Sequence, residues 1–424
     1  MKPTADALRT HGLDLFDFLR RCAFAVLIGL LVGGVGVAFH FGIDLVTELR
    51  QTHSWLILFL PVGGLSIILL YQACGMEKDR GTNLVLVAVR EHEPMRLRTA
   101  PLIFISTVIT HLVGGSAGRE GAALQLGASI SNKIAHKLGV EPEDGRMLTV
   151  CGMAAAFSAL FGTPLTAALF ALEVVHVGIL QYAALVPAFL SSLVGFLLAG
   201  WMGVPPTAYA VTGLPALGAG ALVQVMVLGG LCALLSVLFC QSMHTAGHLY
   251  AKCLPDLRLR AVVGGLIMLA LSFLEGGLAD QVYNGAGGNL IEAAVTLNGA
   301  GVTPWAFLVK MIFTALTLGA GFRGGEIVPT FACGATFGCT MAPLLGLSPS
   351  FGGAVGVVAA FCGVTNCPLS SILLAYELFG GTGLPLFALA IAVSYRLSGY
   401  GGLYSEQQIV YSKVTPKQID KKVG

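Results

Sequence analysis

The sequence carries little charge. Asp, Glu, Lys and Arg make up only 11% of its 424 residues, whereas hydrophobic residues make up 55%. Soluble domains carry about 25% charged residues, so this composition excludes a soluble protein and predicts one that lies in a lipid bilayer. The formal net charge is only +2 and no basic stripe is present. Nucleic acid is therefore excluded as a partner.

Signals for metals, disulfides and cofactors are also missing. None of the ten cysteines has Cys-x-x-Cys spacing, and the nine histidines show no ligand spacing. The cysteines lie in apolar runs, where they act as small packing residues. The sequence therefore predicts no disulfide framework, no metal site and no cofactor. Glycine is abundant instead, with 56 residues, and small residues let membrane helices approach closely.

Apolar segments follow one another along the chain, separated by short polar breaks. Crossing a bilayer takes about 20 apolar residues in a helix. Segments near that length are 23–46, 55–71, 180–199, 221–239 and 261–274. Shorter or glycine-broken segments are 101–113, 122–134, 153–160, 165–175, 351–362 and 369–378. We therefore expect an all-α polytopic membrane protein with broken helices. Transporters place their binding sites at the breaks in such helices.

The chain divides into four parts. Residues 1–21 are amphipathic and predict an interfacial helix on the membrane rather than a signal peptide, with a surface helix without a membrane role as the alternative. Residues 22–210 and 211–411 are expected to form two transmembrane repeats. Residues 412–424 read as a basic tail, with no C-terminal regulatory domain. Basic residues flank both ends, which places both termini in the cytoplasm.

The two halves contain a repeated pattern. Residues 152–173 read Gly-x-x-Ala-Ala-Phe, then Pro-Leu, then Glu, and residues 356–377 repeat this pattern at an offset of 204 residues without a gap. Generic small-residue helices would match less well. The same offset relates Arg119 to Arg323. Matching interrupted segments point to a binding site between the halves. The glutamates that end the two copies suggest a structural role, either in capping neighbouring helices or at a subunit contact; they are Glu173 and Glu377.

The stretch Gly-Gly-Ser-Ala-Gly-Arg-Glu-Gly at 114–121 separates two apolar runs. Its glycines leave N–H groups uncovered before a helix expected from residue 122, and such a helix N-terminus attracts anions. A carboxylate at membrane depth is costly, so we interpret Glu120 as a gating and proton-transfer group that occupies the anion site and leaves when protonated. The alternative is an ion pair with Arg119, although adjacent helical residues do not face each other. The predicted anion-binding residues here are Gly118, Arg119 and Gly121.

Three further stretches supply candidate ligands. Gly-Gly-Glu-Ile-Val-Pro at 324–329 opens a helix and carries Glu326, either a second proton-transfer group or a glutamate stabilised only by the helix dipole. In Gly-Thr-Asn-Leu-Val at 81–85, Thr82 or Asn83 either caps a helix or donates to an anion. Tyr404 follows the last span, where aromatic belt residues are common. The predicted anion-binding residues here are Thr82, Asn83, Ile327, Val328 and Tyr404.

These motifs, in this order, resemble the CLC family of chloride channels and anion/proton antiporters. Residues 118–121 are similar to its gating-glutamate motif, 325–329 to its second Gly-x-x-x-Pro helix entrance, and 81–85 to its serine loop. Tyr404 matches the tyrosine that closes the anion pathway from inside. The resemblance covers nearly the whole chain. It implies a CLC-type fold with two inverted-topology repeats of broken and tilted helices, and a homodimer with one pathway per subunit.

Several residues depart from the usual family pattern. The serine loop contains Asn83, Ile327 replaces a phenylalanine, and Val174 stands where chloride antiporters carry their inner proton glutamate. Glu326 stands where most relatives have an apolar residue. These features resemble the fluoride-exporting branch, CLC-F. Val328 differs from that branch too, because a threonine is expected there.

We therefore expect a secondary active transporter of the cell inner membrane that exports fluoride in exchange for protons. A chloride/proton antiporter or chloride channel of the same family is the alternative. Hydrogen fluoride is a weak acid, closer to a carboxyl group with its pKa of about 4 than hydrochloric acid is, so Glu120 and Glu326 can share protons with fluoride. An intramembrane hydrolase using Ser116 and His111 is disfavoured, because their separation points them in different directions. We expect no catalytic residue and no enzyme. A purely structural scaffold would not need buried carboxylates.

Overall fold

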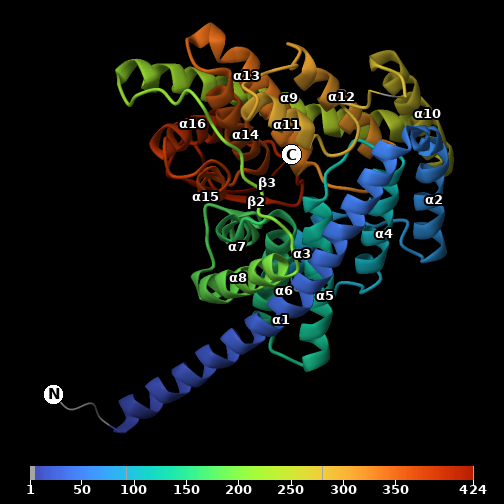
Figure 1. Ribbon diagram of the computed structural model, residues 1–424. Coiled ribbons are helices and arrows are strands. Elements are labelled where there is room, and N and C mark those ends of the chain that lie inside the picture. The colour runs from blue at the N-terminus through green and yellow to red at the C-terminus, as the bar shows by residue number, and fades with distance from the viewer. Residues whose placement is uncertain (1–4, 92, 279, 424) are drawn as a thin grey trace.

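The computed structural model describes residues 5–91, 93–278 and 280–423, with side chains from Leu15 onward. In this part of the chain the protein is a bundle of α-helices with one small sheet (Figure 1). The helices of the first half are α1 (Ala5–Thr52), α2 (Leu60–Ala73), α3 (Thr82–Glu91), α4 (Thr99–Leu112), α5 (Glu120–Leu138), α6 (Pro142–Phe161), α7 (Pro164–Glu173) and α8 (Leu185–Trp201). Those of the second half are α9 (Ala219–Cys253), α10 (Leu257–Glu275), α11 (Gly288–Val295), α12 (Ala306–Gly319), α13 (Ile327–Met341), α14 (Pro349–Thr365), α15 (Pro368–Phe379) and α16 (Leu384–Leu397).

Helix lengths fall into two groups. Five segments are long and apolar enough to cross a membrane: Leu15–Thr52, Ser54–Ala73, Tyr182–Trp201, Ala219–Cys253 and Leu257–Glu275. Two of them begin with 3-10 turns, at Ser54–Phe59 and Tyr182–Ala184, and a third turn lies at Pro343–Leu345. The other apolar helices, among them α7 and α12 to α16, have only 10–17 residues. Helices of this length are expected from the interrupted apolar runs.

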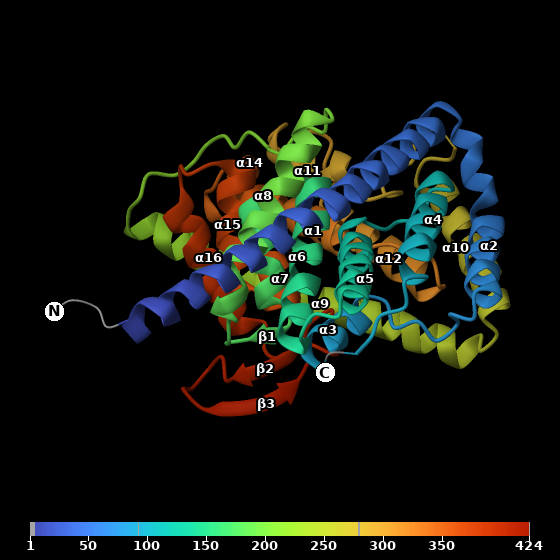
Figure 2. The same ribbon diagram turned by 90° about the horizontal axis from the view of Figure 1, so that it is seen from below.

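Both ends of the chain differ from the sequence prediction. Residues 5–21 do not form a helix of their own but continue into the first apolar run as the single helix α1, which no proline interrupts. Its N-terminal part projects away from the rest of the molecule (Figure 1). The basic tail 412–424 contains strand β3 (Gln418–Lys422), which pairs antiparallel with β2 (Gln408–Tyr411). Strand β2 pairs in parallel with β1 (His176–Val177), so a segment that follows α7 holds the C-terminal segment (Figure 2).

The repeat found in the sequence is a repeat of helices. α5–α6–α7 corresponds to α13–α14–α15. The helices α6 and α14 end at Phe161 and Thr365, and α7 and α15 begin at Pro164 and Pro368, so both junctions keep the offset of 204 residues. The two copies therefore have the same local design, with a buried helix followed by a proline-started short helix.

Glycines let the helices within each copy come close together. A Cβ atom on Gly152 would lie 2.4 Å from the carbonyl oxygen of Gly127, and one on Gly356 would lie 1.9 Å from that of Gly334. No side chain fits at these crossings. Because the backbones touch, α5 packs on α6 and α13 packs on α14 without intervening side chains.

The two copies exchange helix caps. Glu377, at the end of α15, accepts hydrogen bonds from the N–H groups of Leu165 and Thr166 at the start of α7, both at 2.8 Å. Glu173, at the end of α7, accepts them from the corresponding residues of α15 at 3.1 and 2.9 Å. Each carboxylate satisfies N–H groups that a first helical turn leaves without partners, and its charge suits a helix N-terminus. The predicted capping role of Glu173 and Glu377 is confirmed.

A pair of backbone hydrogen bonds joins the copies at a second place. Gly118 and Gly325, just before α5 and α13, bond to each other in antiparallel fashion, with both N···O distances at 2.7 Å. A Cβ on Gly325 would lie 2.7 Å from the amide nitrogen of Gly121. We call this contact the glycine bridge. It brings the N-terminal ends of two helices together at one point.

We predict that Glu173→Ala lowers the stability of the folded protein by about 1–3 kcal/mol, because it leaves the N–H groups of α15 without their charged acceptor. The thermal unfolding midpoint in detergent measures this change. Glu48→Ala, an exposed glutamate of α1, is the matched control and should leave the midpoint where it is. Equal midpoints for the two variants would contradict the capping role.

Gly325→Ala is expected to destabilise the protein by about 1–3 kcal/mol, because the added methyl group meets backbone atoms that have no room to yield. Gly200→Ala is the control, since a Cβ there has no atom within 4 Å. Unfolding midpoints of both purified variants in detergent compare the two positions. If Gly325→Ala unfolds at the same temperature as Gly200→Ala, the close approach at the glycine bridge is wrong.

Candidate functional site: two carboxylates at a glycine bridge

Two cavities are lined by residues that lie next to the glycine bridge in the chain. One has a volume of about 590 Å³, and its lining includes Glu120, Arg119 and Val328. The other has a volume of about 220 Å³, and its lining includes Glu326, Thr82 and Tyr404. We call them the Glu120 cavity and the Glu326 cavity. The two predicted proton-transfer residues thus face different cavities, although their helices start side by side.

Glu120 is fully buried and lies among backbone donors. It is the first residue of α5, two positions earlier than the helix start expected from the sequence. Its Oε2 accepts a hydrogen bond from the N–H of Arg119 at 3.0 Å, and the carboxylate also faces the N–H of Val328 in the first turn of α13. Its Oε1 is buried without a hydrogen-bond partner. The carboxylate therefore occupies the position where two helix N-termini would hold an anion.

The side chain of Arg119 turns away from Glu120. Its Nη1 lies 2.9 Å from Oδ1 of Asp44 on α1. The other oxygen of Asp44 lies 2.9 Å from Nε2 of His40. The alternative interpretation, a structural ion pair between Arg119 and Glu120, is therefore wrong, as the geometry of adjacent residues indicates.

Glu326, Thr82 and Tyr404 come together on the other side of the bridge. A Cβ on Gly121 would lie 3.5 Å from Oε2 of Glu326 and 3.4 Å from the hydroxyl of Thr82. Oε2 of Glu326 and the hydroxyl of Tyr404 are both buried without a hydrogen-bond partner. Tyr404, only 2% exposed, does not belong to an aromatic belt. Polar atoms without partners are costly in an apolar interior, so this cavity is suited to a polar occupant.

Gln125 belongs to this group, although the sequence reasoning missed it. Its Nε2 donates to the hydroxyl of Thr82 at 3.2 Å, and its Oε1 is buried without a partner. It lies on α5 one helical turn after Gly121, on the same face. A glutamine within the otherwise apolar run 122–128 was the available signal. Ile327 and Val328 form the first turn of α13 and are both buried, so their amides lie beside the bridge.

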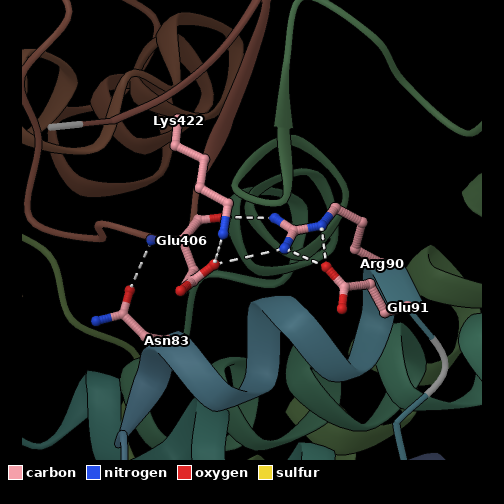
Figure 3. A network of polar contacts seen from close by, with 5 residues as sticks. All are labelled: Asn83, Arg90, Glu91, Glu406 and Lys422. Atoms are coloured by element: carbon pink, nitrogen blue, oxygen red, sulfur yellow. Dashed lines mark hydrogen bonds and ion pairs between the residues drawn. The ribbon is translucent and has the colours of Figure 1, made fainter.

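Thr82 and Asn83, which the sequence left as alternatives, have different contacts. Thr82 is the first residue of α3 and faces Gly121 and Gln125. Asn83 lines the same cavity, but its Oδ1 accepts a hydrogen bond from the backbone N–H of Glu406 at 3.1 Å (Figure 3). That acceptor atom is thus used in holding the C-terminal segment. An anion would be bound by the Nδ2 donor of Asn83 rather than by this acceptor, and both residues line the Glu326 cavity, so both stay candidate anion ligands.

Glu406 and its partners fasten the Tyr404 turn to α3. Arg90 donates to the backbone oxygen of Glu406 at 2.7 Å, and its other terminal nitrogen lies 3.4 Å from the carboxylate of Glu406 (Figure 3). Lys422 of β3 lies 2.6 Å from the same carboxylate. The hydrogen bond from Lys422 is the largest cause that holds the pKa of Glu406 below its ordinary value. No local pattern in the chain indicates this cluster, because Arg90 is far in the sequence from Glu406 and from the segment with Lys422.

Two buried cations near the site were also missed. Lys310 on α12 is fully buried and donates from Nζ to Ser116 Oγ (2.9 Å) and to the carbonyl oxygens of Tyr283 (3.0 Å) and Gly285 (2.7 Å). Arg50 on α1 is also buried, donates to a glutamine side chain and lines the Glu120 cavity. Lys310 stands in the middle of an apolar run, where a charge signals a specific role. The same rule, that a charge within an apolar membrane segment has a specific role, singled out Glu120 and applies equally to Lys310.

The contacts of Ser116 argue against a hydrolytic site. Its hydroxyl bonds to Thr314 and receives a hydrogen bond from Lys310, whereas His111 bonds through Nδ1 to the carbonyl of Thr107. The lysine uses three acceptors and has no lone pair to act as a base in this form. Among the described residues, no group of three or more His, Cys, Asp or Glu is placed to hold a metal ion.

Val174 occupies the end of α7 and is buried. Its carbonyl oxygen accepts a hydrogen bond from Nε2 of Gln407 at 2.9 Å, and that same nitrogen donates to the carbonyl of Thr365 at 2.7 Å. A neutral amide and backbone groups thus fill this position.

Comparison with known proteins places these features in a family. A family model described as "Voltage gated chloride channel" matches residues 63–399. The chain is 35% identical over 412 residues to a "Chloride/fluoride channel protein" of Pseudomonas syringae pv. tomato, covering 96% of this chain and 90% of the relative.

Solved structures agree with this match. A "CLC-type fluoride/proton antiporter" superposes with a TM-score of 0.88 at 32% identity, over 93% of this chain and 99% of that one. A "slow cyanobacterial Cl-/H+ antiporter" superposes with a TM-score of 0.74 at 18% identity, over 89% and 94% of the two chains, and shares the fold. The protein described here therefore belongs to the CLC family of voltage-gated chloride channels and their transporter relatives.

Proposed function

We propose that the protein exports fluoride in exchange for protons. The observation that carries this proposal is the placement of two carboxylates, Glu120 and Glu326, in separate cavities on either side of the glycine bridge, each with one buried oxygen that has no partner. A coupled exchanger needs proton acceptors that communicate with different sides. The similarity to a solved structure named as a fluoride/proton antiporter supports the same activity.

The ionised carboxylate of Glu120 competes with the anion for the same donors. In the structure it faces the amides of Arg119 and Val328. Protonation removes the negative charge and with it most of the attraction to these donors, so the side chain can leave and an anion can take its place. Each proton taken up by Glu120 is then tied to the binding of one anion. Gly118, Gly121 and Ile327 shape this position through their backbone.

Ligands from the Glu326 cavity complete the path. The hydroxyls of Thr82 and Tyr404 donate to the anion, and Gln125 orients Thr82 through the hydrogen bond described above. Oε2 of Glu326 lies beside Gly121. Glu326 can therefore exchange a proton with an anion bound next to that glycine. Asn83 accepts a hydrogen bond from the backbone N–H of Glu406 and so helps to hold the Tyr404 turn in place beside this path.

Fluoride suits this arrangement better than chloride for a chemical reason. Hydrogen fluoride is a weak acid, so a proton can pass between fluoride and a carboxylate. Chloride does not take part in such an exchange. Glu326 supplies the second carboxylate that this chemistry uses, and Val174 supplies no inner proton acceptor.

A chloride/proton antiporter or chloride channel is the second candidate. The shared fold with a solved structure named as a Cl-/H+ antiporter favours it. Both candidates are transporters and neither involves a catalytic residue. We further propose a homodimer in the inner membrane with both termini in the cytoplasm, in which residues 22–210 and 211–411 act as the two halves.

Purified protein in liposomes should release fluoride faster than chloride when each anion is loaded at the same concentration. Ion-selective electrodes measure both rates directly. An opposing proton gradient should drive fluoride uphill, whereas a channel would only dissipate gradients. Faster chloride release would replace fluoride by chloride as the transported anion.

Glu120→Gln should abolish proton movement coupled to anion flux, because an amide cannot take up the proton. A pH electrode beside the fluoride electrode records both fluxes in the same liposomes. Glu48→Gln, at the exposed glutamate of α1, is the control and should keep the coupling. Unchanged proton movement in Glu120→Gln would remove this residue from the mechanism.

A further inference from the structure

Each half of the molecule presents an arginine beside its carboxylate. Arg119 lies one residue before Glu120 and Arg323 lies three residues before Glu326; the offset of 204 residues relates the two arginines but not the two glutamates. Both are paired with an aspartate from the N-terminal quarter of the chain, Arg119 with Asp44 and Arg323 with Asp79. The two cavities are thus built on the same plan, with a glutamate, an arginine and an aspartate in each.

The two ion pairs differ in the distance between the arginine nitrogen and the aspartate oxygen. Nη1 of Arg119 lies at hydrogen-bonding distance, 2.9 Å, from Asp44. Nη1 of Arg323 lies 3.7 Å from Oδ2 of Asp79, which is beyond a normal hydrogen bond. That oxygen accepts a hydrogen bond from the N–H of Gly81 at 3.3 Å instead. Nε of Arg323 and Oδ1 of Asp79 are both buried without a partner. The guanidinium of Arg323 therefore keeps donor capacity that its counter-ion does not use.

Arg323 is nevertheless held in a defined place. Its guanidinium carbon lies 4.3 Å from the ring centre of Tyr71, and its side chain is 24% exposed. It lines the Glu326 cavity, and it also lines a neighbouring cavity of about 290 Å³ formed with residues of α2 and α10. The arginine stands where these two spaces adjoin. An anion that moves toward Glu326 from either space meets it.

We propose that Arg323 binds the anion as it enters the Glu326 cavity and passes it to Thr82 and Tyr404. A guanidinium offers several N–H donors, and an interior with few charges strengthens its attraction for a small anion. Asp79 partly neutralises the cation, so that the anion is bound weakly enough to move on. A purely structural ion pair would close to hydrogen-bonding distance and leave no buried donor unused. This role rests on the proposed function, because it assigns a step within the same transport path.

Membrane vesicles with one orientation test this step. Vesicles that are everted and vesicles that are right side out, from cells that lack other fluoride exporters, expose opposite faces of the protein to the medium. Initial fluoride uptake against external fluoride gives KM and the maximal rate for each face. Arg323→Gln should raise KM about tenfold at one face only, the cost of losing a charge-assisted hydrogen bond to an anion. The maximal rate should stay within about twofold.

Salt separates attraction by charge from an effect on structure. Raising the concentration of an impermeant salt should increase the KM of the unmodified protein at that face, because salt screens the attraction. Arg323→Lys should keep this salt dependence and Arg323→Gln should lose it. Arg258→Gln, which removes an exposed cation bonded to Gln72, is the control and should keep both KM and its salt dependence.

Three outcomes would overturn the role of Arg323. They are an equal rise of KM at both faces, a fall of the maximal rate with KM unchanged, and a salt dependence that persists in Arg323→Gln. If that variant does not accumulate, Asp79→Asn decides instead: removing the counter-charge should lower KM at the same face, and a KM that is unchanged or raised contradicts the proposal. Vesicles of unmodified protein that move chloride but no fluoride would overturn the proposed substrate alone, and the same series with chloride would then test Arg323.

Discussion

The structure depends on two hydrogen bonds between two glycines. Gly118 and Gly325 exchange their N–H and C=O groups just before α5 and α13 begin. Because neither residue has a side chain, the N-terminal ends of both helices reach the same point, and their unused N–H groups make that point attractive to an anion. The carboxylate of Glu120 fills it in this state. Everything that the site does chemically depends on how closely these two backbone segments approach.

The rest of the fold keeps that approach in place. Glu173 and Glu377 cap each other's neighbouring helices, and the relation is reciprocal under the repeat. Glycines at the α5–α6 and α13–α14 crossings bring the helices into backbone contact. The C-terminal sheet, fastened to α3 through Arg90 and Glu406, holds the Tyr404 turn against Thr82. These contacts connect segments from both halves. Thr82, Glu326 and Tyr404, which line the Glu326 cavity, therefore come from three distant parts of the chain.

Two of the cations near the site have well-defined partners. Lys310 is surrounded by three oxygen acceptors, and Arg119 is bound to an aspartate. Glu120, Glu326, Tyr404 and Arg323 each have a buried polar atom without a hydrogen-bond partner, and each lines one of the two cavities. Unsatisfied polar atoms carry a cost in an apolar interior, and at these four residues a polar occupant of the cavity would supply the missing partner.

The sequence by itself determined the class of protein, the repeat and the main carboxylates. Low charge, long apolar runs and a gap-free offset of 204 residues are local or periodic signals, and a glutamate beside glycines in such a run stands out without any structure. Only the tertiary structure decided which polar residues meet. It turned Arg119 toward Asp44, brought Gln125 to Thr82, surrounded Lys310 with acceptors, and paired β3 with β2. These contacts join residues tens to hundreds of positions apart, and neither propensity nor periodicity encodes which distant backbone or side chain will supply a partner.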